Sequence, residues 1–131
     1  MTNFIDLSGK TILVTGATSG IGYEICNQIA KFGGDIIGVG RSQDKLNFLA
    51  NSITHNILFT GITCDLSNVD NLDELIKKIE IPIDGIVHSA GIVELKPIKF
   101  LNIDLLNKIR TVNYDSIVLI ISRLLKKKKN K

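Results

Sequence analysis

The feature that most constrains the fold of this 131-residue chain is a glycine-rich turn at residues 15–22, which read TGATSGIG. The turn directly follows Thr11–Thr15, whose β-branched and aliphatic side chains are typical of a strand buried on both faces. From Gly20 to about Phe32, apolar residues recur at helical spacing, at Ile21, Ile25, Ile29 and Ala30. A strand, a tight turn and a helix in this order predict free N–H groups aimed at an anion.

The rest of the chain alternates short β-branched runs with longer helical patterns. Further strands are predicted at residues 35–39, 58–64 and 83–89. Helices are predicted from an N-cap at Ser42 to about Ile53, from an N-cap at Ser67 until Pro82 stops it, and from about Asn102 toward Leu125. This alternation predicts a single α/β domain with a doubly wound parallel sheet, strand order 3-2-1-4, and helices on both faces.

Composition and charge exclude several classes of protein. Apolar residues make up 44% and charged residues 22%, which is ordinary for a globular domain, and no run approaches the roughly 20 apolar residues of a membrane span. No secretory signal is visible, so we expect a cytoplasmic protein. The formal net charge is +3, but five lysines lie within residues 126–131, so the rest is slightly acidic. That balance argues against a nucleic-acid partner.

The two cysteines are expected to be structural. Cys26 and Cys64 form no CxxC pair, and no histidine stands at a metal-ligand spacing from them. We therefore expect buried thiols and no metal site.

Further motifs follow the glycine turn in order. They are Arg41-Ser42 after the second predicted strand, Cys64-Asp65-Leu66 after the third, His88-Ser89-Ala90-Gly91 after the fourth, and Val112-Asn113 in the next helix. With the turn, they resemble the compact branch of the short-chain dehydrogenase/reductase family over about residues 8–125. The resemblance implies an NAD(P)-binding Rossmann domain at residues 1–125, incomplete at about four strands, followed by a lysine-rich tail at 126–131.

The resemblance and the local chemistry together indicate the cofactor contacts. Small residues let a pyrophosphate and a ribose approach the backbone, which suits the glycines of the turn and the Ala90-Gly91 pair. In the family the aspartate after the third strand bonds the adenine, although Asp65 could equally just turn the chain. The expected cofactor-binding residues are Gly16, Thr18, Ser19, Gly20, Ile21, Gly22, Arg41, Ser42, Asp65, Leu66, Ala90, Gly91 and Asn113.

The end of the second strand favours NADP over NAD. An acidic residue there would bond the ribose hydroxyls and repel a 2′-phosphate, but no carboxylate appears before Asp44. Arg41 is able to clasp a phosphate, with Ser42 as a second donor. The alternative is a solvated arginine at a helix start. His88 departs from the asparagine common at its position, and we expect a neutral ring that hydrogen-bonds between strands.

The family's catalytic set of Asn, Ser, Tyr and Lys is represented only by Asn113. Its tyrosine and lysine stand four apart, but Asn27 follows Tyr23 at that spacing and Val118 follows Tyr114. Hydride transfer to an unknown small carbonyl or alcohol substrate is therefore not expected from these residues alone, and full-length relatives are expected to be homo-oligomeric. A non-catalytic dinucleotide-binding module is the alternative. Membrane attachment through the lysine tail is disfavoured because apolar residues surround the preceding helix.

Lysine and asparagine runs such as residues 126–131 arise from adenine-rich DNA, where insertions and deletions occur easily. The hypothesis is a truncated or frameshifted reductase, against a protein that is naturally short. It predicts that the coding DNA past the stop, translated in all three frames, contains a Tyr-x-x-x-Lys segment. Finding none in any frame would refute the hypothesis.

Overall fold

The computed structural model describes residues 4–129 and contains one parallel four-stranded sheet. The strands are β1 (Thr11–Thr15), β2 (Asp35–Gly40), β3 (Phe59–Thr63) and β4 (Gly85–His88), arranged in the order β3-β2-β1-β4. The central strand β1 pairs with β2 on one side and with β4 on the other, both in parallel. The predicted strand order is confirmed. All four strands therefore end at one edge of the sheet, where the turn and the later motifs meet.

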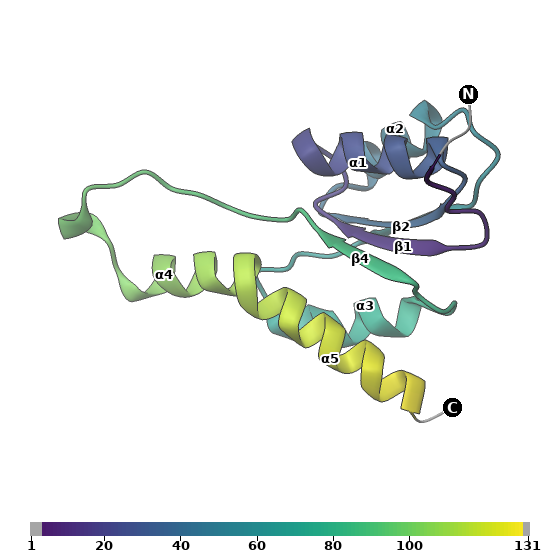
Figure 1. Cartoon of the computed structure of the whole chain (residues 1–131). Coiled ribbons are helices and arrows are strands. Elements are labelled where there is room, and N and C mark those ends of the chain that lie inside the picture. Colours follow the sequence, from purple (N-terminus) through teal and green to yellow (C-terminus); the bar gives the residue numbers. More distant parts are fainter. Residues whose placement is uncertain (1–3, 130–131) are drawn as a thin grey trace.

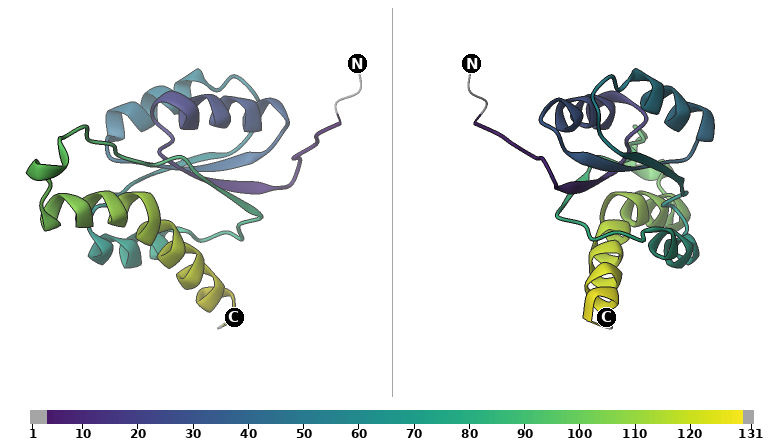
Figure 2. Two further views of the ribbon diagram at one scale, coloured as in Figure 1. Left: turned by 60° about the vertical axis from the view of Figure 1, so that its left-hand side comes forward. Right: turned by 90° about the vertical axis from the view of Figure 1, so that its right-hand side faces the viewer.

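Helices cover both faces of the sheet, as Figure 1 shows. On one face lie α1 (Gly20–Lys31) and α2 (Gln43–Ser52), and on the other lie α3 (Leu72–Lys78) and α5 (Ser116–Lys129). The helix α4 (Ile103–Arg110) precedes α5, and the two are joined by a π-helical turn at Thr111–Asp115. Two short 3-10 turns lie at Val69–Asn71 and Ile98–Phe100. The doubly wound arrangement is therefore confirmed, and the two further views in Figure 2 show the same layering.

The alternation of side chains along the strands builds two cores. Leu13 and Ile37 pack with α3 and Ile120 of α5 on one face, whereas Val14 and Ile36 pack with α1 and α2 on the other. Leu13 and Val14 are both fully buried, as expected for a strand covered on both sides.

Both cysteines are buried, as predicted. Burial raises the pKa of the Cys26 thiol to about 12 and also raises that of Cys64. Neither thiol is ionised near neutral pH, which fits a structural role.

The third helix departs from its predicted limits. Asn68, not Ser67, caps the 3-10 turn by accepting a hydrogen bond from the Asp70 N–H, and α3 begins only at Leu72. Ser67 instead donates both its N–H and its hydroxyl to Asp65 Oδ1. The helix ends at Lys78, before Pro82 is reached. Ser67 and Asn68 are adjacent, and both residue types are favoured as N-caps, so the sequence does not show which of them caps the helix.

The last strand and the last helix also differ from expectation. The strand β4 occupies only Gly85–His88 of the predicted 83–89, and just before it the Asp84 carboxylate accepts a hydrogen bond from the Thr11 N–H. The single helix expected to start near Asn102 does begin there, with the Asn102 side chain accepting from the Leu105 N–H, but the π-helical turn interrupts it. It then continues through the lysines to Lys129 instead of ending near Leu125. Asn130 and Lys131 of the predicted tail lie outside the described residues.

The apolar part of α5 is covered on one side only. Ile120 is fully buried, whereas Val118, Ile121 and Leu125 are exposed. Apolar residues surround this helix, which would suit burial on every side, but in the described residues one side of it is uncovered. Among residues 4–129, no helix is long and apolar enough to cross a membrane.

Lys127 ties α5 to the end of α3, and this contact is testable. Its Nζ donates to the Ile76 carbonyl at 3.0 Å, which also accepts from the Ile79 N–H, and to the Ile79 carbonyl just beyond the end of the helix. Lys127→Met keeps the aliphatic stem but removes the donors, and should lower the free energy of unfolding by about 1–2 kcal/mol in urea titrations. The control Lys126→Met, at an exposed position, should stay within about 0.5 kcal/mol. Equal losses for the two variants would contradict the assigned role of Lys127.

Candidate functional site

The glycine turn forms one wall of a cleft at the carboxyl edge of the sheet. Gly16 has a φ of +64°, and a Cβ placed on it would lie 2.5 Å from the Ala90 backbone nitrogen. A Cβ on Gly22 would lie 2.0 Å from the Gly16 carbonyl oxygen. Any side chain at either position would push the turn away from β4 or from α1. The first turn of α1 carries no acidic residue, so its free N–H groups face the cleft without a competing anion.

Thr15 links this turn to the segment after β4. Its hydroxyl oxygen accepts a hydrogen bond from the Ala90 N–H at 3.2 Å and lies 2.7 Å from His88 Nδ1. Its carbonyl accepts from the Ser89 N–H at 3.2 Å. Thr15 is fully buried, so these contacts are shielded from water. The expected hydrogen bond of His88 between strands is confirmed, and burial lowers the pKa of its ring, which favours the neutral form.

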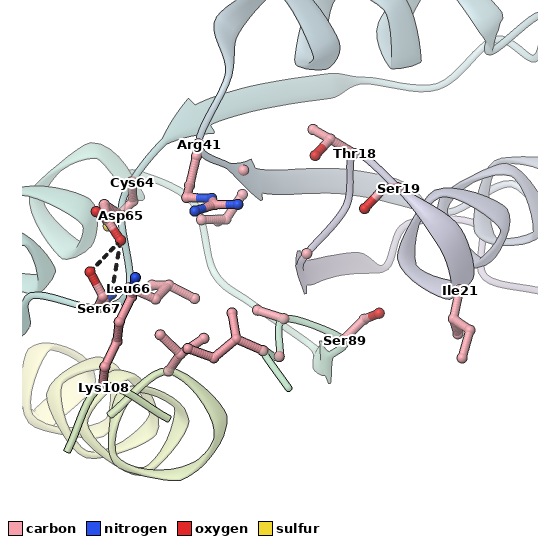
Figure 3. A pocket seen from close by; sticks show the side chains of 17 residues that line it. Thr18, Ser19, Ile21, Arg41, Cys64, Asp65, Leu66, Ser67, Ser89 and Lys108 are labelled. Atoms are coloured by element: carbon pink, nitrogen blue, oxygen red, sulfur yellow. Dashed lines mark hydrogen bonds between the residues drawn. The ribbon is translucent and has the colours of Figure 1, made fainter. Parts of the chain in front are cut away.

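Arg41 and Asp65 come together at the opposite end of the cleft. Arg41 follows β2 and Asp65 follows β3, and Figure 3 shows the guanidinium between the Asp65 segment and Thr18. Asp65 Oδ1 accepts hydrogen bonds from the Ser67 N–H and hydroxyl, and these lower the pKa of the carboxyl, with smaller contributions from Arg41 and Lys108. The site therefore holds an ionised aspartate beside two cations.

The cleft has a volume of about 280 Å³ and brings together most of the residues expected from the sequence. Of the predicted set, it is lined by Gly16, Thr18, Ser19, Ile21, Arg41, Asp65, Leu66, Ala90 and Gly91. Ile21 was expected on the apolar side of its helix but is 75% exposed, since it points into the cleft instead of the core.

Four predicted residues do not line the cleft. Gly20 and Gly22 shape the turn behind it. Ser42 caps α2, where its hydroxyl oxygen accepts from the Lys45 N–H at 3.3 Å. Asn113 is fully engaged with Ile92, because its Oδ1 accepts from the Ile92 N–H at 2.8 Å and its Nδ2 donates to the Ile92 carbonyl at 2.9 Å. Asn113 therefore anchors the chain after Gly91 to the π-helical turn.

Sequence reasoning missed part of the lining. The additional residues are Val39, Gly40, Cys64, Ser67, Ser89, Ile92, Lys108 and Val112. Most are sequence neighbours of predicted residues, and their motifs could have indicated them. Lys108 gives no such signal, because only the position of α4 across the cleft brings it near Asp65. Within residues 4–129, no three His, Cys, Asp or Glu side chains gather as metal ligands.

A parallel sheet with a glycine turn leading into a helix defines a dinucleotide-binding class of fold, and comparison with known proteins identifies the family. A family model described as short chain dehydrogenase matches residues 10–131. A 3-oxoacyl-(acyl-carrier-protein) reductase of Rickettsia bellii is 40% identical over 90 residues, covering 69% of this chain and 36% of the relative. A tropinone reductase homolog of Arabidopsis thaliana is 32% identical over 115 residues, covering 84% and 44%.

Solved structures agree. The oxidoreductase yciK from Escherichia coli superposes with a TM-score of 0.85 at 27% identity, covering 96% of this chain and 55% of that one. The chain therefore belongs to the short-chain dehydrogenase/reductase family. It spans between about a third and just over a half of the length of these relatives.

The turn geometry predicts unequal effects of alanine at two of its glycines. Gly22→Ala places a Cβ against the Gly16 carbonyl and should lower the free energy of unfolding by about 3 kcal/mol or more. Gly20→Ala meets nothing within 4 Å and should cost only about 1–2 kcal/mol, from its φ of +55°. Urea unfolding followed by circular dichroism measures both. A loss at Gly20 that matched or exceeded the loss at Gly22 would contradict the packing described for the turn.

Proposed function

We propose that the cleft binds NADP(H) for an oxidoreductase that transfers hydride between the cofactor and a small carbonyl or alcohol. The observation that carries this proposal is the side-chain-free floor of the cleft, where Gly16 meets Ala90 and α1 begins. A pyrophosphate is the group that such a floor suits, because it needs close backbone donors and tolerates no Cβ. Family membership supports the class of reaction.

The charges at the rim support NADP over NAD. Arg41 lines the cleft directly after β2, where an NAD-binding protein would carry a carboxylate for the ribose hydroxyls. Asp65, the nearby carboxylate, directs Oδ1 to Ser67. A guanidinium with no carboxylate at the end of β2 suits a 2′-phosphate, which it binds through paired donors.

The cofactor preference is tested by titrating the protein with NADPH and with NADH, following nicotinamide fluorescence. NADPH should bind at least tenfold more tightly, which corresponds to about 1.4 kcal/mol. Arg41→Ala should abolish most of that difference while changing NADH affinity little, because NADH lacks the 2′-phosphate. The charge-matched control is Lys31→Ala, at an exposed residue at the end of α1 that does not line the cleft. Equal affinities, or tighter NADH, would contradict the proposal.

We propose that the segment after Gly91 faces the substrate. The segment after Gly91 runs out from the sheet edge to α4, with Val93, Leu95 and Ile98 exposed (Figure 1). Because the R. bellii relative is a 3-oxoacyl-(acyl-carrier-protein) reductase, we propose a carbonyl of this kind as the first substrate to assay.

The placement of the tyrosines supports a second candidate, a dinucleotide-binding module without hydride transfer. Tyr23 of α1 stacks on Phe48 of α2 with ring centroids 6.3 Å apart, and Phe48 is exposed. Tyr114 is exposed on the π-helical turn, and Val118 stands where a lysine would be needed. Neither tyrosine is paired with a lysine one helical turn further on, the arrangement that lowers the pKa of the catalytic tyrosine in the family.

The two candidates differ in turnover. The oxidoreductase reading predicts loss of NADPH absorbance at 340 nm when the 131-residue chain is mixed with a 3-oxoacyl-(acyl-carrier-protein) substrate. The hypothesis of a non-catalytic binding module predicts that NADPH binds but is consumed no faster than in buffer without protein. Since Asn113 is the only member of the catalytic set in the sequence, we propose the second outcome for these residues alone.

A further inference from the structure

His88 occupies a position between the glycine turn and the π-helical turn, and its hydrogen bonds fix its tautomer. The Thr15 hydroxyl oxygen already accepts from the Ala90 N–H, and Thr15 is fully buried. Among the described residues, His88 Nδ1, 2.7 Å away, is the one acceptor within hydrogen-bond distance of this hydroxyl, and a buried O–H left without an acceptor is costly, so we infer that the hydroxyl donates to Nδ1. The ring consequently carries its proton on Nε2 when it is neutral.

The Nε2 side of the ring is buried and has no hydrogen-bond partner among the described residues. The backbone carbonyls of Asn113 and Val112 still act on the ring and favour its charged form, although neither forms a bond of ordinary geometry. These carbonyls belong to the π-helical turn, whose altered backbone pairing presents them toward the sheet. His88 is thus in contact with the two segments that Asn113 and Ile92 tie together.

We propose that His88 is a positioning residue for the cofactor, and that protonation of its ring weakens dinucleotide binding. The neutral ring holds the Thr15 hydroxyl, Thr15 holds the Ala90 N–H, and Ala90 lies against Gly16 on the floor of the cleft. This inference rests on the proposed function, because it concerns the affinity of the same cleft.

Protonation disrupts this chain of contacts for a geometric reason. A charged ring carries hydrogen on both nitrogens, so Nδ1 changes from acceptor to donor. The Thr15 hydroxyl hydrogen then loses its acceptor inside a fully buried site, which is costly. Relief requires the end of β4 to move relative to β1, and this movement disturbs the close approach of Ala90 to Gly16 on the floor of the cleft. In the described structure β4 pairs only with β1, so no second strand holds its end in place.

The surrounding charges leave His88 as the group that titrates. The strand β1 carries no titratable side chain. The π-helical turn carries Tyr114 and Asp115, and Asp115 is paired with Arg110 of α4 at 3.5 Å. On the remaining neighbours, Lys108 lies toward Asp65, and Asp84 accepts from the Thr11 N–H at the far end of β4.

The sign of the effect follows from burial. Burial lowers the pKa of His88 below its ordinary value of 6.5, so the ring is neutral at pH 7. Because the proposed arrangement of the cleft floor needs the neutral ring, affinity should be complete above about pH 6.5 and fall as the solution becomes more acidic.

The test compares NADP+ binding by calorimetry at pH 7.5 and pH 5.0 for the wild type and His88→Asn. An asparagine supplies the same acceptor and donor without titrating in this range. NADP+ is used because it survives acid, and its 2′-phosphate titrates equally with both proteins. The wild type should lose about fivefold more affinity than His88→Asn, and the two should bind equally at pH 7.5.

A second variant separates positioning from general packing. His88→Leu removes the acceptor and should bind NADP+ at least tenfold more weakly at both pH values, with circular dichroism confirming that it is folded. The same pH dependence of NADP+ affinity in the wild type and His88→Asn would overturn the role of His88 but leave the cofactor assignment standing. Absence of binding by the wild type at pH 7.5 would overturn the cofactor assignment as well, and a ring protonated on Nδ1 in nitrogen NMR spectra would overturn the tautomer.

Discussion

The contact between the glycine turn and the end of β4 is the constraint on which the rest of the site depends. Gly16 and Ala90 approach so closely that a single Cβ would separate them, and Gly22 meets the Gly16 carbonyl from the start of α1. The buried Thr15 hydroxyl joins the same two segments by accepting a hydrogen bond from the Ala90 N–H. The floor of the cleft is therefore backbone, held in place by packing behind it, and backbone N–H groups are what an anionic cofactor requires.

The sheet and its helices explain how such a floor remains rigid. Each central strand buries one side chain toward α1 and α2 and the next toward α3 and α5, so β1 cannot slide or rotate without disturbing both cores. Parallel strands then deliver Arg41 and Asp65 to the same edge from neighbouring strands. Ile92, which Asn113 holds through two hydrogen bonds, lines a third side of the cleft. The segments that follow β2, β3 and β4 thus bring their side chains to one cleft because the same sheet holds all three.

Much of this could be predicted from the sequence because the signals are local. The strand order, the buried cysteines, the cap at Ser42 and the start of a helix near Asn102 all follow from short patterns read in context. The rest depends on contacts between distant residues. Ser67 was expected to cap a helix but donates to Asp65, and Lys108 reaches the site only because α4 crosses it. The π-helical turn at Thr111–Asp115 has no periodicity that distinguishes it from helix.

The central claim is that a backbone floor at the carboxyl edge of the sheet receives the dinucleotide. Amide NMR spectra recorded during titration with NADPH test this most directly, because they report on the backbone groups themselves. The account predicts the largest shifts at residues 16–22 and at Ala90 and Gly91, with smaller ones at Asp65 and Leu66. Shifts concentrated instead at the apolar cavity between Ile81, Ile86 and Leu125, or no shifts at saturating NADPH, would contradict it.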